Sequence, residues 1–139
     1  MIKEIVKDQE ILTQKSERFN RKEPGTLISD ILETANANVD RCVGLAAIQI
    51  GVPKRVIVVK MGDGKFKPFI NPVIIWKGTQ TYTATEGCLS LDGERQVKRY
   101  KQIRVAYENV QGKTKVENFS GFLAEVIQHE VDHLNGILI

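Results

Sequence analysis

Residues 128–139 read QHEVDHLNGILI, and the rest of the chain can be interpreted outward from this stretch. His129 and His133 lie four residues apart, so on a helix both imidazoles project from one face. There they can bind a single divalent ion at about 2.0–2.1 Å. Glu130 follows the first histidine, where a carboxylate can reach a water on that ion without being a ligand. The chain has only these two histidines, and both fall among apolar residues, so we favour a metal site over two core or surface histidines.

The residues around this pattern predict a helix from Ser120 to Asn135. Apolar side chains recur there at steps of three and four, which is the spacing of one helical face. They are Phe122, Leu123, Val126, Ile127 and Leu134. Ser120 is suited to the N-cap and Gly136 to the C-terminal end of such a helix.

The remaining segments predict an α+β fold in a single domain, residues 1–139. We expect mostly antiparallel strands around the C-terminal metal-binding helix, with an N-terminal helix from about Thr26 to Asn38. Strands are expected at 55–61, 79–85, 103–110 and 114–119. Pro72 interrupts the apolar run 69–76, which therefore reads as two short strands or as one edge strand with a bulge. No repeat or long linker divides the chain.

Composition and charge exclude several classes of protein. With 42% hydrophobic and 27% charged residues, the chain is typical of globular proteins. The net charge of +3 comes without a dense basic run, so we infer no nucleic-acid binding. The first twelve residues carry charges every few positions, unlike a signal peptide, and no apolar stretch approaches the roughly 20 residues of a membrane span. We therefore expect a cytoplasmic protein, and no oligomeric state follows from the sequence.

The third metal ligand must lie upstream, because none of residues 134–139 can bind a metal. This position excludes the common zinc proteases whose third ligand follows the second histidine. A carboxylate, Cys88 or Cys42 remains. Cys88 lies in TEGCLSL after an expected strand, and Cys42 follows the N-terminal helix. Either cysteine could instead be a small buried hydrophobe, so spacing alone leaves the choice open.

Three motifs, in order along the chain, resemble those of the peptide deformylase family. They are CVGLAAIQ at 42–49, EGCLS at 86–90 and QHEVDH at 128–133. With INP at 70–72, the resemblance covers almost the whole chain. The first motif departs at one position, because Cys42 stands where the family has glycine. A cysteine there would add strain if the backbone needs a positive φ, or would narrow the cleft.

The resemblance implies a set of catalytic groups. Cys88, His129 and His133 would hold one divalent metal ion per chain, with a water in the fourth position. The ion would be Fe²⁺ in the cell, and Zn²⁺, Ni²⁺ or Co²⁺ could replace it. Glu130 would act as general base and then general acid. The Gln49 side-chain amide and the Leu89 backbone N–H would stabilise the oxyanion.

The resemblance also implies the substrate. The enzyme would remove the formyl group from the N-terminal methionine of nascent polypeptides, near the ribosome, and would release formate. We expect Gly44, Leu45, Glu86 and Gly87 to lie on the peptide-binding side, with main-chain hydrogen bonds at Gly44. Glu86 could also form a buried salt bridge that positions the Cys88 loop, and Arg95 would pair with it or frame the substrate.

Two other functions remain compatible with the residues. One is a metalloamidase that acts on another small acyl group. The other is a catalytically weak, metal-bound peptide-binding paralogue. Since all three ligands and the glutamate are present, we expect a working enzyme.

Overall fold

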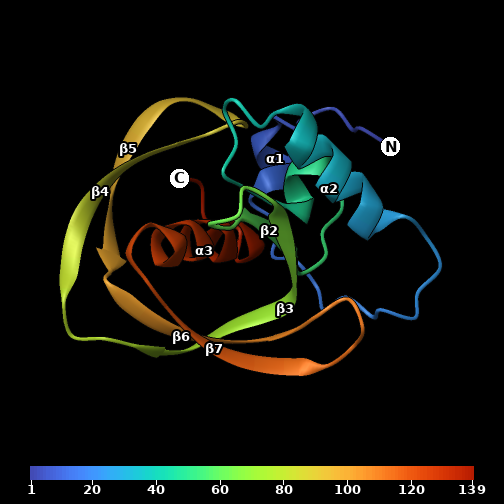
Figure 1. Cartoon of the computed structure of the whole chain (residues 1–139). Coiled ribbons are helices and arrows are strands. Elements are labelled where there is room, and N and C mark those ends of the chain that lie inside the picture. Colours follow the sequence, from blue (N-terminus) through green and yellow to red (C-terminus); the bar gives the residue numbers. More distant parts are fainter.

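The computed structural model describes all residues from 1 to 139. Helix α3 (Gly121–Leu134) crosses the middle of the molecule, and the strands curve around it (Figure 1). Neighbouring strands in both sheets are antiparallel. The predicted α+β fold, with antiparallel strands around the C-terminal helix, is thus confirmed.

The strands form a five-stranded sheet and a separate hairpin. The sheet has the order β1-β2-β3-β6-β7, so β1 and β7 are its edges. Its strands are β1 (Gly44–Ala46), β2 (Val56–Lys60), β3 (Phe66–Lys77), β6 (Gln102–Glu108) and β7 (Thr114–Ser120). The hairpin consists of β4 (Thr81–Cys88) and β5 (Leu91–Tyr100). The other helices are α1 (Gln9–Leu12), α2 (Leu27–Ala37) and a 3₁₀ turn, η1 (Ala47–Ile50).

Strand β2 is buried on both faces, because a helix covers each side of this part of the sheet. Ile57 and Val59 belong to the core that contains α3. Val56 and Val58, which alternate with them, belong to the core that contains α2. Side chains of successive strand residues point to opposite faces, so one continuous apolar strand serves two cores and fixes α3 against the sheet.

The last turn of α3 is held by groups from outside the helix. The Arg55 guanidinium donates to the Leu134 carbonyl at 3.1 Å and to the Asn135 side chain at 3.1 Å. Gly136 follows with φ of +76°, a conformation that suits glycine at a helix end. Ser120 has extended backbone angles at the N-cap, but its side chain makes no capping hydrogen bond.

The structure corrects two expectations about the strands. Residues 66–77 form a single strand with an irregularity at Pro72, as in one of the two expected alternatives, but this strand lies in the interior of the sheet and not at an edge. Pro72 is tolerated because β3 pairs with β2 only up to Ile70 and with β6 from there on, with a register shift between Ile70 and Val73. Proline has no backbone N–H, but at this point, where β3 changes its partner strand, no hydrogen bond between strands is lost. Strand β5 was not expected at all, since its residues are mostly polar.

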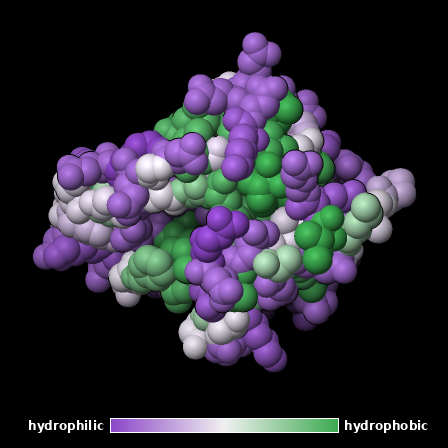
Figure 2. All heavy atoms as spheres, turned by 90° about the horizontal axis from the view of Figure 1, so that it is seen from above, coloured by the Kyte–Doolittle hydropathy of each residue, from purple (hydrophilic) through white to green (hydrophobic).

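None of the helices combines the length and the apolar character that a membrane span requires. Seen from above, the surface is mainly hydrophilic, and hydrophobic groups gather toward the centre of this face (Figure 2).

Candidate active site

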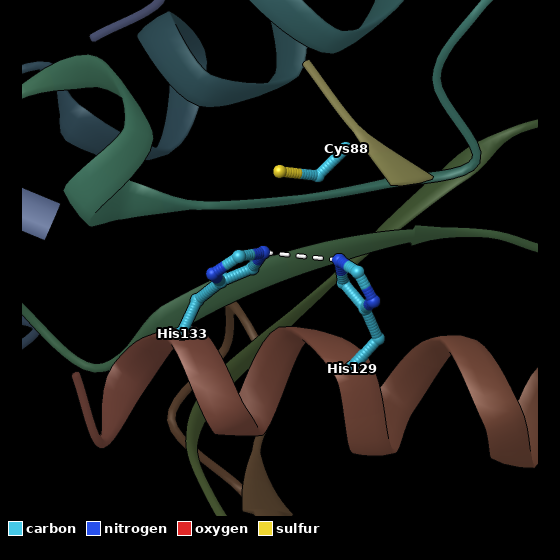
Figure 3. A group of neighbouring side chains, drawn as sticks. All are labelled: Cys88, His129 and His133. Carbon is cyan, nitrogen blue, oxygen red and sulfur yellow. Dashed lines mark hydrogen bonds between the residues drawn. The ribbon is translucent and has the colours of Figure 1, made fainter. Parts of the chain in front are cut away.

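Three side chains of the right chemistry converge between α3 and the end of β4. His129 and His133 project from one face of the helix toward Cys88 (Figure 3). Their ligand atoms all lie within 4.8 Å of one another, and the two Nε2 atoms are 3.0 Å apart. Two nitrogens at tetrahedral positions, each about 2.0–2.1 Å from an ion, would be about 3.3–3.4 Å apart. One thiolate and two imidazoles at this spacing fit a divalent metal.

The position of Cys88 follows from an irregularity in the hairpin. The β4–β5 register shifts between Glu86 and Cys88, just before the turn at Leu89 and Ser90. A bulge re-aims side chains relative to the regular alternation. Here it brings the sulfur over the two histidines of α3.

A buried network of charges fixes His129. Its Nδ1 lies 2.8 Å from Glu86, whose carboxylate accepts two hydrogen bonds from Arg99, at 2.9 and 2.7 Å. Arg99 also donates to Asp132 of α3 at 2.6 Å. A carboxylate on the outer nitrogen of a ligating histidine sets its tautomer and orientation. The Nε2 atom is thus free to bind a metal.

The pKa values follow from this network. Burial opposes ionisation of Glu86, but the bonds from Arg99 and His129 lower the pKa of its carboxyl to about 2. Burial alone would lower the pKa of His129, yet Cys88 and Glu86 raise it to about 10. Burial is the main cause that lowers the pKa of His133, and the positive charge of His129 lowers it further, to about 3. His133 is therefore neutral, the form that a metal binds, whereas His129 has to release its proton before its Nε2 atom can bind the ion.

Arg99, and not Arg95, is the partner of Glu86. Arg95 lies directly opposite Glu86 in the hairpin register, but its Nη1 donates to the Asp92 carbonyl at 3.2 Å. The expected Arg95–Glu86 pair is wrong because Arg99 can satisfy Glu86 and Asp132 at once, between the hairpin and the helix. Arg99 was not among the residues expected at the site.

Glu130 is buried beside the two histidines and lacks a partner for one oxygen. The residue is 4% exposed, and its Oε1 makes no hydrogen bond. Burial raises the pKa of this carboxyl to about 7. A carboxyl with that pKa can accept and return a proton near neutral pH.

The two expected oxyanion donors lie near Cys88. Gln49 is buried, its Oε1 accepts from the Ala46 N–H at 3.0 Å, and its Nε2 donates to Ser90 at 3.2 Å. An amide nitrogen carries two N–H groups, so a second donor remains. Leu89 lies in the turn after Cys88, and the hydrogen bonds of the turns and loops do not include its N–H.

A cavity of about 220 Å³ opens beside these groups. Of the residues expected to contact the peptide, Gly44, Glu86 and Gly87 line it, together with Leu89. Leu45 does not, because its side chain is fully buried in the core on the α2 side of the sheet. Gln49 also lies outside the lining.

Cys42 lines the same cavity but lies in a different setting. Its thiol donates to the Gly44 carbonyl at 3.1 Å. Burial, reinforced by the nearby Glu130 charge, raises the pKa of this thiol to about 12. The backbone angle of Cys42 is not among the positive φ values of the chain, so the expected backbone strain is absent.

Comparison with known proteins agrees with this geometry. The model of the polypeptide deformylase family matches residues 2–139. The chain belongs to this family. A peptide deformylase from Clostridium beijerinckii is 47% identical over 139 residues, which cover all of both chains. One from Brachyspira hyodysenteriae is 41% identical and covers 99% of this chain and 78% of the relative.

Solved structures of the family have the same fold. A class I type b peptide deformylase from Acinetobacter baumannii superposes with a TM-score of 0.88 at 32% identity, covering 99% of this chain and 96% of the other. A probable peptide deformylase from Synechococcus phage S-SSM7 superposes with a TM-score of 0.83 at 40% identity, and the match covers 99% of this chain and 95% of the other. As a member of the family, the chain is a metal-dependent hydrolase that removes N-formyl groups from nascent peptides.

Proposed function

We propose that Cys88, His129 and His133 hold the metal of this enzyme and that the ion is Fe²⁺ in the cell. The observation that carries this proposal is the close approach of one sulfur and two imidazole nitrogens in a mostly buried place. The sulfur–nitrogen donor set suits Zn²⁺, Co²⁺ and Ni²⁺ as well as iron, so these ions would substitute in vitro.

When bound, the divalent metal supplies a Lewis acid that polarises the formyl carbonyl and lowers the pKa of water. Glu130 accepts the proton of the attacking water through its free oxygen and delivers it to the leaving amine. Its burial and raised pKa support both roles, because the same carboxyl must gain and lose the proton within one turnover.

The developing negative charge on the formyl oxygen needs donors that are already in place. The second N–H of Gln49 and the backbone N–H of Leu89 are proposed for this purpose. Ser90 and Ala46 hold the Gln49 amide from both ends, which keeps it from turning away during the reaction.

The peptide would bind beside β1, in the cavity between this strand and α3. β1 is an edge of the sheet, so an extended peptide can form main-chain hydrogen bonds there, at Gly44. Leu45 would contribute only its backbone, since its side chain lies in the core. We also propose that the single domain 1–139 acts in the cytoplasm, where nascent chains leave the ribosome.

The test is formate release from formyl-Met-Ala-Ser by protein loaded with iron or nickel, compared with Glu130→Gln. The variant is expected to keep its metal and to lose about 10²- to 10⁴-fold in kcat. Absence of turnover by the metal-loaded wild type would favour a peptide-binding role. Faster hydrolysis of acetyl-Met-Ala-Ser would favour an amidase for another acyl group.

A further inference from the structure

Glu125 is a carboxylate of the cavity wall for which the reaction above has no use. It lies on α3 four residues before His129, one turn along the same face, and both residues line the cavity. The Tyr82 hydroxyl donates to its Oε1 at 2.8 Å and fixes its position. Glu125 forms no salt bridge, and burial together with the neighbouring Glu86 carboxylate raises the pKa of its carboxyl.

The charges around the cavity leave Glu125 without a cation. The nearby Arg99 is shared between Glu86 and Asp132. The cavity lining contains three glutamates, Glu86, Glu125 and Glu130, and a single arginine, Arg41, which is exposed and forms no ion pair. The wall at Glu125 therefore favours a positive group on a bound molecule.

Apolar side chains beside Glu125 can pack against a long side chain of a bound peptide. Val126 and Phe122 line the same part of the cavity, and Phe122 is 61% exposed. One turn of helix, about 5.4 Å, separates Glu125 from His129. An extended lysine spans a similar length, with an apolar stem and a charged end. A residue bound by its formyl group at the histidines would reach Glu125 with such a side chain.

We propose that Glu125 is a specificity-determining residue that makes the enzyme accept formyl peptides whose first residue is lysine. The inference rests on the proposed function of the same site. The apolar residues of the cavity wall contact a methionine side chain. The Glu125 carboxylate binds the ammonium of a lysine side chain, an ion pair that an uncharged side chain of similar length cannot form.

The experiment compares kcat/KM for formyl-Lys-Ala-Ser and formyl-norleucine-Ala-Ser at pH 8, in the wild type, Glu125→Gln and Glu125→Leu. The lysine-to-norleucine ratio is expected to fall about tenfold in both variants, because a charge-assisted hydrogen bond is lost. Each enzyme is its own reference for folding and metal content, since only the ratio is used. Arg41→Gln removes the only arginine of the cavity lining and is expected to raise the ratio.

Glu10→Gln, an exposed residue of α1, is the control for a change in net charge and should leave the ratio unchanged. A ratio that is the same in wild type and both Glu125 variants overturns the inference. A charge preference seen only with formyl-Met-Lys-Ser, and not at the first residue, overturns it as well. Failure of the wild type on formyl-Met-Ala-Ser would instead reject the proposed function, so the two failures are distinguishable.

Discussion

Cys42 and Cys88 line the same cavity, yet their neighbours give the two thiols different chemistry. Cys88 ends β4 and lies within ligand distance of His129 and His133. Cys42 precedes β1, is 3% exposed, and its thiol donates a hydrogen bond to the Gly44 carbonyl. A high pKa keeps the Cys42 thiol protonated, whereas metal ligands must be thiolates. In the proposed site, Cys42 is therefore a structural thiol, and Cys88, which follows the bulge and lies near both imidazoles, is the ligand.

Cys88→Ser is the substitution that tests the different roles of the two cysteines most strongly. We expect more than about a hundredfold loss of metal affinity, because even changes beyond the ligands cost 10- to 100-fold. Metal content after dialysis against a graded series of chelator concentrations measures the effect. If the serine variant keeps one ion as tightly as the wild type, the proposed third ligand is wrong.

On the Cys88 side of the cavity, Arg99→Gln is expected to lower the free energy of unfolding by about 3–5 kcal/mol. The substitution leaves the buried carboxylate of Glu86 without its cation. Urea denaturation measures the change, and metal affinity should fall with it, since Glu86 orients His129. Arg95→Gln is the matched control, with a loss below about 1.5 kcal/mol, because Arg95 bonds only to one carbonyl.

On the Cys42 side, Gly44→Ala tests how closely β1 approaches Glu130, the proposed general base. A Cβ at Gly44 would lie 2.7 Å from Val126 Cγ1 and 2.8 Å from Glu130 Oε2. Overpacking of this kind costs about 1–3 kcal/mol, and the shift of Glu130 should lower kcat about tenfold or more. Metal content is expected to stay near one ion per chain. Unchanged kcat would show that Glu130 has more freedom than this packing allows.

Cys42→Ser should have the smallest effect. The hydroxyl can keep the hydrogen bond to Gly44, so we expect metal content to be unchanged and stability to fall by about 1 kcal/mol or less. Metal analysis and urea denaturation, run beside Cys88→Ser, check this. Loss of the ion in both variants would remove the distinction between the two thiols.

The sequence was sufficient for the parts of the molecule that depend on local patterns. The α3 helix was predicted to within one residue at each end, because its apolar periodicity is strong and residues at both ends suit helix termini. The helix expected from Thr26 to Asn38 is α2, with these two residues as its caps. Cys88 could be selected from the resemblance, but spacing alone could not separate it from Cys42.

The parts that were missed depend on contacts between distant segments. β5 carries Glu94, Arg95, Lys98 and Arg99 in a hairpin with one exposed face, so no apolar alternation indicated it. The role of Arg99 arises only when α3 packs on the hairpin and brings Asp132 to the same guanidinium. Leu45 shares a motif with Gly44, but successive side chains of a strand face opposite sides.

The outer edge of β1 also limits when this enzyme can act. Three residues of unpaired edge, next to a narrow cavity, can pair only with a chain end that is extended and free of other contacts. A protein whose first residues are already part of a sheet or a helix offers no such end. If the peptide binds at this edge as proposed, the formyl group must therefore leave before its own chain has finished folding.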